Sequence, residues 1–365
     1  MLRFMKHSAV SAKRVVSLDF LRTTAIMAVV ALHTLPVPLL NGGGLPFWLS
    51  VVVESTSKIG VPLFLIISGY LMLDRDYSGS KLKRFFVHNY LPLFVSFELW
   101  ALLVSPVVFL GKESGGVPSL FATMLFMGEP YMIHFWYMQM LLGIYLMVPV
   151  LAAFLKRISM DGNNWYLALL VAVSVTFVLV LPTAQYVAQW LRYEADAEIT
   201  LGGFVGRGAL GLLYMLIGYC LRTVDFFDHA PAWARWITLA GSLVLLWMVS
   251  AWEYKLTGEF FLVTKGFLPI AFTAFALSWV AIKGSAWNDC PRWLSAVFFG
   301  FATYSYGIYM VHLPLHKVVD VILPDAMHLL RVAMLNPIST ILLSLLCCWI
   351  IARLPVVRRW MLAMK

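Results

Sequence analysis

Charged side chains are scarce in this sequence: Asp, Glu, Lys and Arg make up 12% of its 365 residues, about half the fraction typical of a soluble domain. Cysteine is scarce too, and the four cysteines form no CxxC pair, which argues against a disulfide framework or a zinc site. No soluble domain, solenoid repeat, linker or low-complexity segment is evident. Hydrophobic residues instead make up 61%, with a mean hydropathy of +0.84. The composition excludes a soluble globular protein and predicts one integral membrane domain over residues 1–365.

Long apolar runs define the expected fold. Runs of about 17 to 25 residues can cross a bilayer as helices, and they predict an all-α polytopic membrane protein with about ten transmembrane helices around a central polar cavity. The predicted spans are residues 15–38, 51–73, 85–110, 131–155, 165–182, 204–221, 236–252, 267–282, 294–315 and 332–352. The run 118–127 is too short to span and is expected to be interfacial or re-entrant. The basic stretch 1–14 precedes a run too long and too polar for a cleavable signal, so we expect a retained first span.

Lys and Arg between the spans predict the orientation. Connections on one predicted side hold 18 of them, those on the other side hold six, and three lie within spans. The richer side should be cytoplasmic, and it carries both termini. The acidic segment 192–198 (RYEADAE) then falls outside. The net charge of +9 follows this topology, so we do not predict nucleic-acid binding from it.

Polar residues interrupt the first apolar run, SLDFLRTTAIMAVVALHT (17–34). Eleven residues separate Arg22 from His33, which is three helical turns plus about 20°, so the two side chains share a face roughly 16 Å apart along the axis. Asp19 precedes Arg22 by about one turn and is within pairing distance. Ionisable groups in lipid are costly, so this face should line the protein interior or a wet cavity. The structural alternative is an Asp19–Arg22 pair that only locks the helices together.

The predicted topology divides the other cations between two depths. Lys58 should lie at a height similar to that of His33, in the outer half of the membrane. Arg22 should lie in the inner half, near a basic run of Lys81, Lys83 and Arg84. A basic inner mouth suits a long anionic cofactor whose phosphates meet Arg and Lys while its reactive end reaches His33.

Several of these residues have structural alternatives. Glu54 and Lys58 have the favourable i,i+4 order for an ion pair. The basic run could be only a topogenic signal or a headgroup contact. The Ser68–Gly69 step could mark a close helix contact through small residues.

The aromatic and histidine motifs also have structural alternatives. His134 and Trp136 could be interface anchors. His312 and His316 lie one turn apart, but a packed or hydrogen-bonded role is favoured over metal, and no metal is expected. Glu98, in the middle of the third predicted span, is hardest to explain as structural.

The motifs resemble a known family. Arg22 and His33 with ten residues between them, preceded by the Asp of LDFLR, are similar to the arginine–ten–histidine signature of the membrane acyltransferase-3 family. The segments GVPLFLIISGYLML (60–73), KLKRFF (81–86), HFWYMQMLLGIYLMVPVL (134–151) and YSYGIYMVHLPL (304–315) resemble further family patterns in the same order. The basic run is shorter than in many members and has Lys where they have Arg.

The resemblance implies an acyltransferase of the bacterial inner (plasma) membrane. The donor would be cytoplasmic acetyl-CoA or another acyl-CoA, and the acceptor a sugar hydroxyl of a cell-surface polysaccharide or of its lipid-linked precursor. A hydroxyl needs a base near neutral pH, and His33 is the candidate, with an acyl-histidine intermediate as the less favoured variant. Arg22 would contact phosphate or orient His33 through Asp19.

The remaining site residues have less specific roles. Lys58, Ser68 or Tyr306 could donate to the oxyanion, and Trp136 could stack on sugar or adenine. Besides Lys58, Ser68 and Tyr306, the candidate binding residues for substrate or cofactor are Lys81, Lys83, Arg84, Glu98, His134, Trp136 and His312.

Two rival functions fit the same composition. The main one is a transporter or flippase for a glycan or an organic anion, although the inverted repeats and broken helices typical of such folds are not evident. The other is a non-catalytic membrane subunit of a polysaccharide assembly complex. The sequence specifies neither the acyl group, the acceptor sugar nor the oligomeric state.

Overall fold

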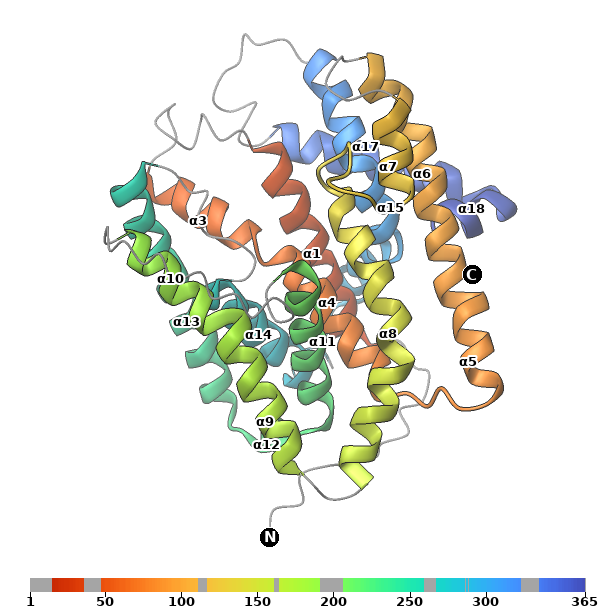
Figure 1. Cartoon of the computed structure of the whole chain (residues 1–365). Helices are drawn as coiled ribbons and strands as arrows, with labels where there is room; N and C mark the ends of the chain where they lie inside the picture. Colours follow the sequence, from red (N-terminus) through yellow and green to blue (C-terminus); the bar gives the residue numbers. More distant parts are fainter. Residues whose placement is uncertain are drawn as a thin grey trace. The chain divides into compact units, whose positions relative to one another are not determined.

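The computed structural model describes residues 15–35, 47–110, 117–160, 164–190, 206–258, 267–285, 287, 289–322 and 335–364. The acidic segment 192–198, the N-terminal basic residues and the first residues of the sixth and tenth predicted spans lie outside these ranges. The described residues form helices and no strands (Figure 1). The predicted all-α polytopic membrane fold is therefore confirmed.

The described residues contain fewer long apolar helices than the ten predicted spans. Among the described residues, seven helices are long and apolar enough to cross a membrane: Val16–Thr34, Phe47–Met72, Ser80–Pro106, Phe135–Met160, Trp165–Ala188, Ala232–Thr257 and Arg292–Val319. Two shorter apolar helices, Leu268–Lys283 and Asn336–Ala352, match the predicted spans 267–282 and 332–352 in position. The number ten is therefore not confirmed, and the central polar cavity stays a prediction.

The chain forms two compact units. Unit 1 comprises Met1–Leu32, Pro36–Arg75 and Val150–Ala302. Its complete helices are α3 (Phe47–Ser57), α4 (Gly60–Met72), α9 (Asn164–Val175), the π-helical turn η2 (Thr176–Val180), α10 (Leu181–Trp190), α11 (Arg207–Thr223), α12 (Phe226–His229), α13 (Ala232–Thr257) and α14 (Leu268–Lys283).

Unit 2 comprises His33–Leu35, Asp76–Pro149 and Thr303–Lys365. Its complete helices are α5 (Ser80–Phe85), the π-helical turn η1 (Phe86–Tyr90), α6 (Leu91–Leu110), α7 (Val117–Met124), α17 (Asn336–Ala352) and α18 (Pro355–Met361). Three helices contribute residues to both units: α1 (Val16–Thr34), α8 (Phe135–Met160) and α15 (Arg292–Ile322).

In unit 1, glycines bring α4 and α11 into backbone contact. A Cβ atom added to Gly69 would lie 1.9 Å from the carbonyl oxygen of Met215, and one added to Gly218 would lie 2.0 Å from that of Ile66. Only glycine permits so close an approach, and small residues serve the same purpose in other membrane helix pairs. The close helix contact predicted at the Ser68–Gly69 step is confirmed.

A short turn at Lys58 and Ile59 separates α3 from α4. The Lys58 ammonium lies 3.2 Å from the Glu54 carboxylate, and both side chains are about nine-tenths buried. The predicted i,i+4 pair is therefore present, so each buried charge has a counter-ion beside it, which buried charges need.

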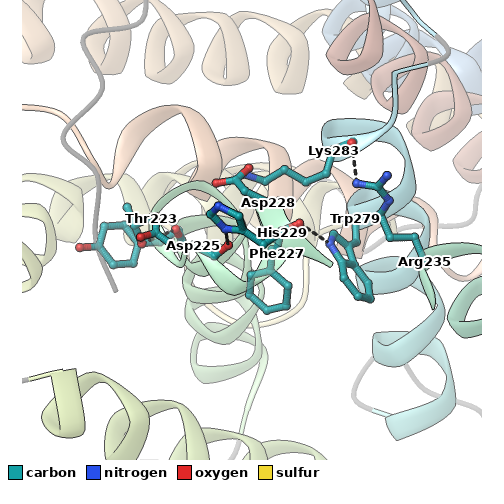
Figure 2. Close-up of polar contacts among 9 residues, drawn as sticks. Thr223, Asp225, Phe227, Asp228, His229, Arg235, Trp279 and Lys283 are labelled. Carbon is teal, nitrogen blue, oxygen red and sulfur yellow. Dashed lines mark hydrogen bonds and ion pairs between the residues drawn. The ribbon is translucent and has the colours of Figure 1, made fainter. Parts of the chain in front are cut away.

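Polar contacts join α12, α13 and α14 within unit 1 (Figure 2). The Lys283 ammonium lies 2.5 Å from the Asp228 carboxylate, and Arg235 donates a 2.7 Å hydrogen bond to the Lys283 carbonyl. The Trp279 indole N–H donates to the Phe227 carbonyl at 3.1 Å. Arg235 thus satisfies a carbonyl at the end of α14, where the helix has no partner of its own.

In unit 2, the C-terminal helix α18 lies against α6 (Figure 1). The Met361 carbonyl accepts two hydrogen bonds of 2.7 Å, from the Ser96 hydroxyl and from the Trp100 indole N–H. Leu362 is buried, and one of its methyl carbons would lie 2.6 Å from a Cβ added to Gly307. These contacts fix the end of α18.

Candidate functional site

Three histidines from distant parts of the sequence meet in unit 2. His33 lies near the end of α1, His134 directly precedes α8, and His312 lies in α15. The ring centroids of His33 and His312 are 5.1 Å apart, and those of His134 and His312 are also 5.1 Å apart. We call these three residues the histidine cluster; His134 and His312 are fully buried and His33 is partly exposed.

The hydrogen bonds within the cluster determine which ring nitrogens carry protons. Nδ1 of His312 lies 2.6 Å from the Tyr309 carbonyl, and because a carbonyl only accepts, this nitrogen must donate. Nε2 of His312 lies 3.2 Å from Nδ1 of His33. With both rings neutral, Nε2 of His312 accepts and Nδ1–H of His33 donates. His33 is then the tautomer whose Nε2 carries the lone pair that a base needs.

His134 occupies the far side of the cluster. Its Nε2 donates a long hydrogen bond of 3.4 Å to the Met310 carbonyl, which leaves Nδ1 as the acceptor nitrogen of a neutral ring. Among the described residues this buried Nδ1 has no hydrogen-bond partner. A buried polar atom without a partner costs free energy, so this nitrogen is a place where a ligand hydroxyl or a water would be stabilised.

Tyrosines hold the histidine cluster in place. The Tyr309 hydroxyl donates a short hydrogen bond to the main-chain carbonyl of His134, and its ring lies 5.2 Å from that of Tyr137 and 5.7 Å from that of His312. Both tyrosines are buried. Within the described ranges, no group of three His, Cys, Asp or Glu side chains could hold a metal ion. The hydrogen bonds of His312 with the Tyr309 carbonyl and with His33 are of the kind that can orient an imidazole for proton transfer.

Other predicted residues of unit 2 lie in separate contacts. The Tyr306 hydroxyl donates to the Ser96 hydroxyl at 2.9 Å and so belongs to the attachment of α18. Glu98 lies in α6, and its Oε1 is buried with no hydrogen-bond partner among the described residues. The Trp136 ring lies 6.2 Å from that of Tyr137.

The basic run lies at the start of the α5–α6 segment. Lys81 is bound to the Asp76 carboxylate at 2.6 Å, so its charge is already paired. Lys83 and Arg84 are exposed, and Arg84 lines a cavity together with residues of α18.

Four predicted site residues belong to unit 1: Asp19, Arg22, Lys58 and Ser68. Asp19 is buried, and its main-chain carbonyl accepts a 2.8 Å hydrogen bond from Thr23. Helix α1 is unbroken from Val16 to Thr34, as the shared face of Arg22 and His33 requires. The functional roles of all four residues stay predictions.

Sequence reasoning did not select Tyr309 as a site residue, although it lies within the quoted motif 304–315. It also did not predict that Arg84 and Arg359 line the same cavity. Tyr309 precedes His312 by three residues, the spacing at which helical neighbours share a face, so this signal was available. Arg359 contributes to the cavity but was interpreted only as a topological charge. His33 and His312 are 279 residues apart, and no local pattern predicts their hydrogen bond.

Comparison with known proteins places the chain in a family. No match was found among curated proteins or among solved structures. The family of the acyltransferase domain matches residues 15–353, which include the whole histidine cluster and nearly all described helices. The chain therefore belongs to the acyltransferase-3 family and is a membrane acyltransferase.

Proposed function

We propose that this protein transfers an acyl group from acyl-CoA to a hydroxyl of a cell-surface polysaccharide or of its lipid-linked precursor, with His33 as the general base. Acetyl is the acyl group we favour, because the segment SKIGVPLF (57–64) most resembles the enterobacterial common antigen O-acetyltransferase. Membership of the acyltransferase-3 family supports the reaction class. The bacterial inner membrane, with both termini cytoplasmic, is the proposed location, based on the distribution of Lys and Arg.

The hydrogen bond between His33 and His312 carries this proposal. Nε2 of His33 would take the proton of the acceptor hydroxyl as its oxygen attacks the thioester carbonyl. The tetrahedral intermediate then collapses, the carbon–sulfur bond breaks, and CoA leaves as a thiolate that receives the proton from His33. An ester and CoA–SH result, and His33 returns to its starting form.

His312 would act as a positioning residue in this reaction. By accepting from Nδ1–H of His33 it favours the tautomer with a lone pair on Nε2, and it limits rotation of the ring. Its own orientation is fixed by the Tyr309 carbonyl at 2.6 Å. The arrangement parallels a catalytic triad in its logic, although a second imidazole and a main-chain carbonyl stand where a triad has a carboxylate.

The other predicted residues would bind the two substrates. Arg22, Lys83 and Arg84 would meet donor phosphates, with Lys81 available only if it leaves Asp76. Lys58 or Ser68 would donate to the oxyanion; Tyr306 is less suited because its proton is already donated to Ser96. Trp136 and the unpartnered nitrogen of His134 would contact the acceptor sugar, and Glu98 stays a candidate for the same site.

The test is acyl transfer by the purified protein in nanodiscs, with radiolabelled acetyl-CoA and a panel of lipid-linked saccharides. We expect labelled ester that alkali releases, and loss of this product in His33→Ala. A matched control is His229→Ala, because His229 is exposed and its ring nitrogen lies 2.8 Å from the main-chain carbonyl of Asp225. A transporter predicts movement of the saccharide with no ester formed by the wild type, and that result would overturn the proposal.

A further inference from the structure

A cavity of about 370 Å³ lies between the basic run and the C-terminal helix of unit 2. We call it the C-terminal pocket. It is lined by Arg84, His88, Pro92, Arg359, Ala363 and Met364. The first three residues come from α5, η1 and α6, and the last three from α18 and the residues that follow it.

The first wall of the pocket is one face of a continuous helical segment. Arg84, His88 and Pro92 follow one another at four-residue steps, which places their side chains on the same side. His88 lies in the π-helical turn η1. Such turns are rare, and they occur frequently at functional sites.

The second wall is held rigidly. The Met361 carbonyl is bound by Ser96 and Trp100, at 2.7 Å each, and Leu362 is buried directly beyond it. Arg359 lies two residues before this anchor, and its guanidinium carbon lies 5.1 Å from the ring centre of Trp360. The backbone that carries Arg359 is therefore fixed before any ligand binds, which lowers the entropy cost of binding.

The lining of the pocket is basic. Among its described residues are two arginines and a histidine and no carboxylate. In the described part of the chain, neither Arg84 nor Arg359 has a carboxylate partner. Lys81 differs: hydrogen bonds from Lys81 and then from Ser78 hold the pKa of the Asp76 carboxyl well below its usual range, so Asp76 is an anion at neutral pH and neutralises Lys81.

Two guanidinium groups that line one cavity repel each other unless an anion lies between them. Arginine binds phosphate through paired N–H donors, and these charge-assisted hydrogen bonds are among the stronger ones. We propose that the C-terminal pocket binds a phosphate group of the acyl-CoA donor, with Arg84 on one wall and Arg359 on the other. This inference depends on the proposed function only for the identity of the ligand, because a lipid headgroup offers the same phosphate chemistry.

The test compares Arg359→Gln with Arg358→Gln in the full chain. Arg358 is the adjacent arginine of the same helix and does not line the pocket. Binding of CoA is titrated calorimetrically in nanodiscs of phosphatidylcholine. We expect Arg359→Gln to weaken CoA binding about tenfold to a hundredfold, the loss of one charge-assisted hydrogen-bonding group, and Arg358→Gln to change it less than about twofold.

A double variant and a lipid measurement complete the design. Arg84→Gln should weaken CoA binding as Arg359→Gln does, and the double variant should lose less than the sum of the two free energies because both arginines bind one phosphate. Retained phosphatidylglycerol is counted by native mass spectrometry in parallel. If Arg359→Gln lowers lipid retention and leaves CoA binding unchanged, the phosphate belongs to a lipid and the donor assignment is overturned.

If Arg359→Gln changes neither measurement, the site itself is overturned. The unfolding temperature of each variant shows whether the protein is intact; Arg359 is exposed, so little change is expected. CoA binding can be measured without catalytic turnover, so this test is independent of the proposed reaction. A protein that binds CoA through Arg359 but forms no ester would contradict the proposed reaction while supporting the pocket.

Discussion

The ion pairs of unit 1 and the histidine cluster of unit 2 hold their polar side chains in different ways. In unit 1, charges meet opposite charges: Arg222 lies 2.8 Å from Asp74, Lys283 lies 2.5 Å from Asp228, and Lys58 lies 3.2 Å from Glu54. In unit 2, the histidine cluster is joined by a hydrogen bond between two imidazoles and by main-chain carbonyls. In an ion pair the two opposite charges neutralise each other and hold the two side chains in place. In a pair of neutral imidazoles, one ring nitrogen can still accept a proton from a substrate. The difference predicts that variants of the Arg222–Asp74 and Lys283–Asp228 pairs affect stability and that variants of the histidine cluster affect turnover.

The largest expected effect is that of His33→Ala on the rate of acyl transfer. Removal of a general base typically costs about 100- to 10,000-fold, and the unfolding temperature should change little because His33 is partly exposed. The measurement is the initial rate of ester formation from labelled acetyl-CoA. A rate within about threefold of the wild type would show that His33 is not the base.

The next largest effect is on folding, from Gly69→Ala. A Cβ at this position would lie 1.9 Å from the Met215 carbonyl oxygen, so α4 and α11 must separate, at a cost of about 3 kcal/mol or more. The fraction of monodisperse protein after heating in detergent measures this loss. Gly241→Ala in α13 is the matched control, because nothing lies within 4 Å of its added Cβ; equal losses in both variants would contradict the role of the glycine contact.

A smaller effect on turnover is expected from His312→Ala. Loss of the acceptor for Nδ1–H of His33 should lower kcat about tenfold to a hundredfold, the scale of a small misplacement of a catalytic group, with the KM for acyl-CoA nearly unchanged. His312→Gln should restore part of the rate, since its amide oxygen can accept the same hydrogen bond. His316→Ala, one turn further along α15, is the control.

The rate profile against pH separates a positioning role of His312 from a merely structural one. Removing the neighbour that hydrogen-bonds His33 should shift the acidic limb of kcat/KM, which reports the free enzyme's essential base. An unchanged limb together with a lower unfolding temperature would assign His312 to packing alone.

The smallest effect is expected from Lys283→Met in unit 1. Asp228 is about half exposed, so water can solvate it once Lys283 is gone, and the free energy of unfolding should fall by about 1 kcal/mol or less. The rate of acyl transfer should stay at the wild-type value. A large loss of turnover with an intact fold would remove the distinction between the two units.

Local sequence patterns predicted the local features of this molecule. Hydropathy predicted the all-α membrane fold, the i,i+4 spacing predicted the Glu54–Lys58 pair, and the small residue at Gly69 predicted a close helix contact. Helix ends were harder, because hydropathy does not show where a helix starts. Helix α15 runs from Arg292 to Ile322, beyond both ends of the predicted span 294–315.

Features that join distant segments were predicted only in part. The first-span pattern identified His33, and the late motif identified His312, but their hydrogen bond depends on how α1 and α15 pack. Arg359 was missed because topology already explained a basic C-terminal segment. Its place opposite Arg84 follows from the hydrogen bonds that Ser96 and Trp100 make to Met361, which no charge pattern reveals.

The Tyr309 carbonyl that orients His312 has a consequence for mutagenesis. A systematic alanine scan alters side chains and leaves every main-chain oxygen in place. It would therefore detect His33 and His312 and overlook the Tyr309 carbonyl that accepts from His312. A defect in Tyr309→Phe would report a different bond, the one from its hydroxyl to the His134 carbonyl. Only a change to the peptide group itself, such as an amide-to-ester replacement following Tyr309, would weaken that acceptor and show how much it contributes.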